Sequence, residues 1–139
     1  MNFSKNLSLA VIIAGIGMAI GMPKNIVAAS VTPTLFSNWT SGNATTECAQ
    51  IGTYQHALKI DNWDSTDPSG NHFASGNQIT IANVQIDEGE RKKFDWNSNP
   101  TAISGVIVKA ATSANIFNYN PASNSDSELY APEHKGISH

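Results

Sequence analysis

Apolar and polar residues alternate in several short segments downstream of residue 50. In the stretch YQHALKI, four side chains share one parity: Tyr54, His56, Leu58 and Ile60. Gln55 and Lys59 occupy the opposite parity. A repeat of two residues is typical of a β-strand with one buried face, so this segment is predicted to be a half-buried strand.

The segment NQITIANVQI carries two apolar pairs of opposite parity: Ile79 with Ile81, and Val84 with Ile86. A regular strand cannot turn both pairs toward one core, because successive side chains point to opposite faces of the sheet. One extra residue between the two pairs would place both on the same face of the sheet. The pattern therefore predicts a β-bulge near Ala82 and Asn83.

The densest apolar run, Val106–Val108, is β-branched and does not alternate. Such a run suits a central strand that is buried on both faces. Trp96, Phe117 and Tyr119 fall at the inward parity of other predicted strands. We expect these three side chains in the core, since aromatic burial contributes strongly to core stability.

Helical periodicity is absent downstream of the N-terminal segment, where no stretch of about 11 residues repeats apolar positions at i, i+3, i+4 and i+7. Short strands separated by clusters of turn-forming residues indicate an antiparallel β fold. The sequence thus predicts an all-β protein, an antiparallel Ig-like β-sandwich. We assign residues 47–139 to it. Residues 30–46, rich in Ser, Thr and Asn, are predicted to be a flexible segment with at most a short edge strand.

The first 29 residues have the features of a secretory leader. Lys5 precedes an apolar run from Leu7 to Met22, and Val27 and Ala29 supply small residues at the −3 and −1 positions of a signal peptidase site. The run is short for a membrane-spanning helix, which needs about 20 residues. We expect residues 1–29 to be a signal peptide that contacts the membrane only before its removal.

Removal of this leader makes the chain more acidic. Lys5 and Lys24 are lost, so the basic residues fall from eight to six while all eleven acidic residues remain, and the formal net charge changes from −3 to −5. Such a chain lacks the basic footprint of nucleic-acid-binding proteins and has no polybasic patch for a membrane surface. No nucleic-acid partner is predicted, and we expect a secreted or cell-surface protein.

Cys48 is the only cysteine in the sequence. Exported proteins fold in oxidising compartments, where cysteines usually pair. A single cysteine leaves open an intermolecular disulfide, a reduced thiol, or a partner that is missing from this chain.

Several short segments occur together in a recognisable combination. They are Phe94-Asp95-Trp96, Val106-Ile107-Val108-Lys109, Ala114-Asn115-Ile116-Phe117 with Tyr119, Asp126 with Leu129 and Pro132, and Ser138-His139, with Cys48 and Leu58-Lys59-Ile60-Asp61 upstream. Across about residues 47–139, this combination resembles an uncharacterised β-sandwich module of bacterial secreted and cell-surface proteins.

The resemblance implies one more strand after Ser138-His139, ending in a cysteine that could pair with Cys48. The sandwich would then lack its C-terminal strand in this chain. One departure from the module lies at Ala110-Ala111, where the module has two glycines, which reach positive φ more freely than alanine.

Two candidate binding sites lie in the polar stretch DNWDSTDPSGN. Asp61, Asp64 and Asp67 could supply oxygen ligands to Ca²⁺, which takes six to eight of them. Their spacing differs from that of known calcium loops, and the same residue types are common in solvated turns. Trp63 has no evident packing role in so polar a stretch, which suggests an exposed indole that stacks on a sugar.

The function expected from these features is that of a non-enzymatic extracellular or cell-surface module with a structural or adhesive role. No catalytic residue is predicted, since no nucleophile-elbow motif occurs. The alternative is a carbohydrate-binding module of a secreted protein, with Trp63 in an aromatic row. Expected partners are an extracellular protein or a glycan surface, and calcium is the one candidate cofactor. A sandwich that lacks a strand would also leave an unpaired edge, which favours strand-mediated self-association.

Overall fold

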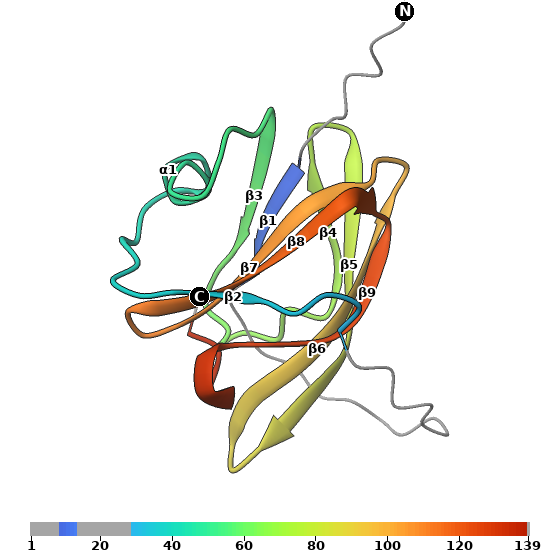
Figure 1. Cartoon of the computed structure of the whole chain (residues 1–139). Coiled ribbons are helices and arrows are strands. Elements are labelled where there is room, and N and C mark those ends of the chain that lie inside the picture. Colours follow the sequence, from blue (N-terminus) through green and yellow to red (C-terminus); the bar gives the residue numbers. More distant parts are fainter. Residues whose placement is uncertain (1–8, 14–28, 139) are drawn as a thin grey trace, which may run out of the picture.

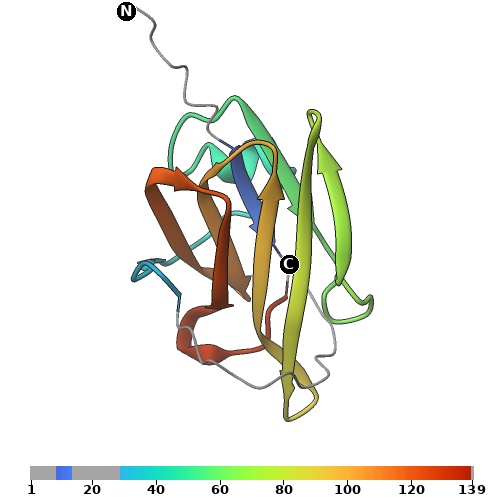
Figure 2. The same cartoon turned by 90° about the vertical axis from the view of Figure 1, so that its right-hand side faces the viewer.

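Two β-sheets packed face to face form the protein (Figures 1 and 2). The computed structural model describes residues 9–13 and 29–138. The first sheet has the order β2 (Thr34–Phe36), β8 (Ser113–Ser123), β7 (Ile103–Ala110), β1 (Leu9–Ile13), β3 (His56–Ile60). The second has the order β4 (Gly70–Ala74), β5 (Asn77–Asp87), β6 (Glu90–Asn99), β9 (Ser125–Tyr130). Neighbouring strands are antiparallel except where β1 takes part, so the predicted all-β sandwich is confirmed.

The central strand β7 is buried on both faces, as its unbroken apolar run predicts. Val106, Ile107 and Val108 are all 0% exposed. Val106 and Val108 belong to the main core between the sheets, whereas Ile107 belongs to a second cluster on the outer face of the first sheet. Both faces of β7 are therefore covered, which explains why its sequence does not alternate.

The aromatic side chains assigned to the core are buried there. Trp96, Phe117 and Tyr119 all belong to the main cluster. The rings of Trp96 and Tyr119 meet edge to face with their centroids 5.5 Å apart, and the Tyr119 hydroxyl donates to Asp126 at 2.7 Å. The polar end of Tyr119 is thus satisfied inside the core.

The predicted β-bulge is present in β5. Its pairing with β6 is regular up to Ala82 opposite Asp95, and the register then shifts before Gln85. Asn83 adopts a left-handed conformation with φ of 49°. The irregularity lets Val84 join Ile79 and Ile81 in the core, while Ile86, beyond a second shift, remains exposed.

The sequence did not predict strands β1 and β4, the short helix α1 (Ala44–Cys48) or the 3-10 helix η1 (Pro132–His134). Helix α1 has only five residues, too few for an apolar periodicity to show. Strand β4 lies in the polar stretch GNHFA and pairs with β5 at the edge of its sheet, with Phe73 exposed. An edge strand exposed in this way does not need the alternation that marks a half-buried strand.

Two boundaries also differ from the expectation. Residues 30–46 contribute the edge strand β2 and the buried Trp39, so the sandwich begins upstream of residue 47. Tyr54 packs in the outer cluster with Ala57 and not with Leu58, which packs on the main core. The chain bends at Gln55 before β3 begins, and this bend breaks the parity that joined Tyr54 to the strand.

The segment Leu9–Ile13, which belongs to the predicted leader, forms strand β1. It lies between β7 and β3 and runs parallel to both. The remainder of the predicted signal peptide, apart from Ala29, lies outside the described residues.

The turn between β7 and β8 contains an alanine in a strained conformation. Ala111 is exposed and has φ of 52°, a region that costs a residue with a Cβ about 1–2 kcal/mol. We predict that Ala111→Gly stabilises the full chain by about 0.5–1 kcal/mol, once the greater entropy of glycine in the unfolded chain is subtracted. The backbone N–H of residue 111, which donates to Ser138 Oγ at 3.1 Å, is kept.

Urea unfolding of the full chain measures this change. The matched control is Ala110→Gly, one residue earlier, where the side chain is buried and φ is negative. This control should lose about 0.5–1 kcal/mol. A loss of stability in both variants would contradict the assignment of strain to Ala111.

Candidate functional site

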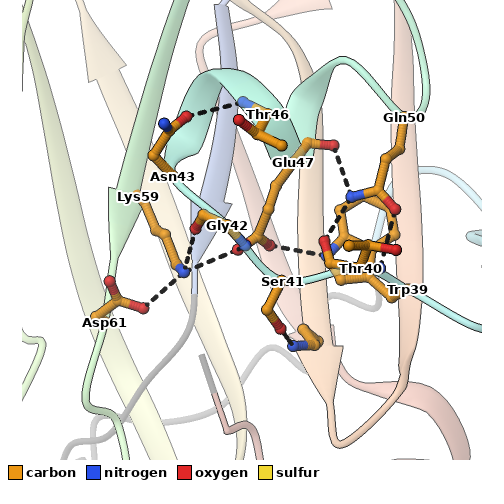
Figure 3. Close-up of polar contacts among 11 residues, drawn as sticks. Trp39, Thr40, Ser41, Gly42, Asn43, Thr46, Glu47, Gln50, Lys59 and Asp61 are labelled. Carbon is orange, nitrogen blue, oxygen red and sulfur yellow. Dashed lines mark hydrogen bonds and ion pairs between the residues drawn. The ribbon is translucent and has the colours of Figure 1, made fainter.

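A cluster of polar side chains lies where α1 and its preceding loop cover the outer face of the first sheet (Figure 3). Asn43 caps α1, since its side-chain oxygen accepts a hydrogen bond from the backbone N–H of Thr46 at 2.9 Å. The cap fixes the first turn of the helix. This turn carries Glu47, whose carboxylate reaches Lys59 of β3.

Glu47 is the centre of this cluster and is fully buried. One carboxylate oxygen accepts from Trp39 Nε1 at 2.8 Å. The other accepts from the backbone N–H of Gly42 and from Lys59 Nζ, both at 2.8 Å. Burial by itself would raise the pKa of Glu47, but these hydrogen bonds outweigh it and leave the pKa below its ordinary value.

Lys59 joins the loop to strand β3. Its Nζ donates to the backbone oxygen of Gly42 at 2.8 Å and lies 3.2 Å from a carboxylate oxygen of Asp61. Burial would lower the pKa of Lys59, but the hydrogen bonds to Glu47 and Asp61 raise it above its ordinary value. Glu47 and Lys59 are therefore held in opposite charge states, which favours a permanent ion pair over exchange of a proton.

A second lysine is buried close to this ion pair. Lys109, near the end of β7, has a fully buried side chain whose Nζ donates to Ser41 Oγ. Burial lowers the pKa of Lys109. This contact ties the loop that carries Trp39 to the central strand, as the ion pair ties it to β3.

Cys48 follows Glu47 in α1 and packs in the outer cluster with Ile107. The side chain is 2% exposed. Burial, together with the charge of Glu47, raises the pKa of the thiol to about 12. At neutral pH the sulfur is therefore protonated and is a poor nucleophile.

The three aspartates proposed for calcium do not share a site. Asp61 faces Lys59, and Asp67 accepts a hydrogen bond from the backbone N–H of Ser69 at 2.9 Å, as in a turn. Asp64 lines a different hollow, beside Trp63. Within residues 9–13 and 29–138, no group of three or more His, Cys, Asp or Glu side chains is placed to hold a metal ion. The calcium hypothesis gains no support from this arrangement.

Trp63 is not exposed as the sequence suggested. Its side chain is 0% exposed, and its ring meets Phe94 edge to face with centroids 4.9 Å apart. The loop after β3 turns the indole into the main core, which a local reading of polar neighbours could not reveal. A buried indole offers no face to a sugar, so the expectation of an exposed stacking residue at this position is wrong.

Tyr130 and His134 form an aromatic pair that the sequence analysis did not single out. Tyr130, at the end of β9, stacks on His134 with ring centroids 4.3 Å apart. Both rings line an open hollow of about 490 Å³ together with Leu35 and Pro33. The residues that line this hollow come from three parts of the chain, within 32–37, 110–115 and 130–135, and no local motif connects them.

The described side chains thus divide into two groups. The charged side chains that are buried (Glu47, Lys109 and Asp126) or partly buried (Lys59) make their hydrogen bonds within the scaffold. Those around Tyr130 and His134 line a hollow that is open to a ligand. No helix among the described residues is long and apolar enough to cross a membrane.

Comparisons with family models, with curated proteins and with solved structures find no match to this chain.

The contribution of Glu47 to stability can be tested by Glu47→Gln. We predict a loss of about 2 kcal/mol at neutral pH, because the partly buried Lys59 ammonium would face a neutral amide. The pKa of Glu47 in the folded chain lies below its ordinary value of 4.5, so the unfolded chain takes up the proton first. The contribution is therefore complete above pH 4.5 and is lost as the pH falls through the lowered folded-state pKa.

Urea unfolding between pH 7 and pH 3 measures both effects, and the difference between wild type and variant should shrink at the acid end. Glu133→Gln is the control, since Glu133 pairs with Lys135 at 2.7 Å on the exposed surface, where water screens the pair. Its stability should match that of the wild type. A loss in Glu47→Gln that persists unchanged at pH 3 would refute a role for the carboxylate charge.

Proposed function

We propose that this chain is an exported, non-enzymatic module with a structural or adhesive role outside the cell or at its surface. The observation that carries the proposal is a β-sandwich whose strands, apart from β1, lie downstream of a leader-type segment, and whose described buried charged groups make their hydrogen bonds within the scaffold. Export is the natural reason for such a leader. The resemblance to surface modules of bacteria supports the same role.

The buried ionisable groups favour a scaffold over a catalyst. Active sites keep groups poised to gain or lose a proton near neutral pH. Here the pKa of Glu47 is lowered, that of Lys59 is raised and that of Cys48 is raised to about 12. Each of these three shifts moves the group away from neutral pH and fixes its charge state. Burial lowers the pKa of Lys109, but its Nζ donates to Ser41 Oγ within the scaffold.

Apolar side chains on the edges of both sheets support an adhesive role. Leu35 on the edge strand β2 is 60% exposed, and Phe73 on the edge strand β4 is 69% exposed. Exposed edges with apolar side chains can add a strand from another molecule. We propose an extracellular protein or a second copy of this chain as the partner of these edges.

A carbohydrate-binding role is the second candidate, now on different residues. The stacked rings of Tyr130 and His134 beside an open hollow favour it, since aromatic faces bordered by polar groups can bind sugar rings. Thr32, Ser37 and Glu133 line the same hollow and could donate or accept hydrogen bonds there.

Export can be tested at the leader cleavage site. We predict that the full chain, expressed in a bacterial host, appears outside the cytoplasm with Ser30 as its first residue. Ala29→Arg should block cleavage because the −1 position requires a small residue, whereas Ala28→Arg, at the tolerant −2 position, should not. Intact mass and N-terminal sequencing measure the outcome. Wild-type protein that stays in the cytoplasm with Met1 intact would contradict export.

The carbohydrate alternative can be tested with His134→Ala. If the hollow binds glycans, this variant should lose about tenfold or more in affinity for any oligosaccharide that the wild type binds on a glycan array. His56→Ala, in β3 and away from the hollow, is the matched control and should bind as the wild type does. Equal loss in both variants, or no binding by the wild type, would argue against this role.

A further inference from the structure

Strand β1 occupies a slot one strand wide in the first sheet. It pairs in parallel register with β7 from Ala10 opposite Gly105 to Ile13 opposite Val108. On its other side it pairs with β3 from Leu9 opposite His56 to Ile13 opposite Ile60. The strands β7 and β3 are neighbours only through β1, and at two strand spacings they lie about 10 Å apart.

Removal of the leader would open this slot. Residues 9–13 belong to the segment that the sequence identifies as a signal peptide, and cleavage after Ala29 takes them away. The edges of β7 and β3 that now pair with β1 would then lack hydrogen-bond partners within a sheet. Unpaired backbone groups beside a core are costly, so an open slot favours the entry of another strand.

The slot borders the main core on one face and a mostly apolar layer on the other. Position 11 of β1 is aligned with Val106 and Leu58, which belong to the main core between the sheets. Position 12 is aligned with Ile107, which belongs to the outer cluster under α1, and with Lys59, whose ammonium is paired with Glu47. A strand seated there must therefore be apolar at odd and even positions alike, as the sequence LAVII is.

We propose that the slot between β7 and β3 is a strand-acceptor site. Once the leader is removed, it binds an extended, uncharged, aliphatic segment of at least five residues from another protein. The bound segment adds to the sheet by main-chain hydrogen bonds to both neighbours, and its side chains enter the main core on one face and the mostly apolar layer on the other. The inference rests on the proposed export, because export removes β1.

A different protein is a better source of this strand than a second copy. Each of the strands β2 to β9 is already paired within its own sheet. The edge strand β2 has only three residues and follows Pro33, which cannot donate a main-chain hydrogen bond. Within residues 30–138, a second copy that has lost its leader thus has no unpaired aliphatic strand of five residues to give.

Cys48 supplies a natural reporter of occupancy. Helix α1 contacts both β1 and β3, and the thiol is 2% exposed in the presence of β1. Loss of the strand beneath α1 should expose the thiol to alkylating reagents, and its replacement should protect the thiol again.

The test uses the full chain, produced without export so that it folds with β1 in place. A protease recognition sequence replaces residues 23–28, and the linker is cut after folding. We then add a synthetic peptide with the sequence LSLAVIIAG, residues 7–15, labelled with fluorescein. We expect the peptide to exchange into the cut chain, as fluorescence anisotropy reports, and Cys48 alkylation to be about tenfold slower with the peptide than without it.

A proline peptide is the matched control. The same sequence with Val11→Pro stays apolar but lacks one main-chain donor and should neither bind nor protect Cys48. Val11→Pro in the full chain provides a second measurement, since its leader segment should dissociate when the linker is cut. Retention of the wild-type segment after cutting would also support the site, because no covalent link then holds it.

Three results would overturn the proposal. One is equal binding of the wild-type and proline peptides, which would indicate non-specific apolar contact. Another is a cut chain that loses residues 1–22 with no change in Cys48 alkylation. The third is a cut chain that forms dimers on size exclusion that excess peptide does not dissociate, which would make a second copy the occupant. None of these results bears on export, since the chain tested is never exported.

Discussion

The burial of β7 on both of its faces is the constraint on which the rest of the structure depends. Val106 and Val108 need a second sheet on one side, and Ile107 needs a cover on the other. The sheet of β4, β5, β6 and β9 provides the first, and the loop with α1 provides the second. A strand apolar on both faces cannot lie at an open surface, so both layers follow from this one run.

The loop and helix α1 that cover the outer face of the first sheet pack through apolar side chains and are held in place by polar contacts. Trp39 and Cys48 fill the space over Ile107, and Glu47 beneath them binds Trp39 and Lys59. A buried carboxylate is costly unless it is paired and hydrogen-bonded, and here three donors converge on it. The hydrogen bonds and the ion pair of Glu47 therefore hold the loop in one arrangement. The burial of apolar side chains contributes the free energy that stabilises the loop on the sheet.

The same central strand links the scaffold to the proposed role. One edge of β7 pairs with β8, and its other edge pairs with a strand from the segment that export would remove. If that strand is removed as proposed, the first sheet would have an unpaired edge at its middle, away from the usual sheet margins. Partner binding at that edge would complete the core as well as form an interface.

The sequence by itself determined the fold class, the doubly buried β7, the bulge in β5 and the aromatic core, because each depends on the parity of neighbouring side chains. Only the tertiary structure decided the site. Trp63 lies among polar sequence neighbours, yet its ring packs against Phe94, 31 residues further along the chain. Glu47 appears to be an ordinary polar residue until Lys59 and Trp39 meet it, and Tyr130 and His134 gain a hollow only where Leu35 lies beside them. These features depend on long-range contacts, which parity along the chain does not encode.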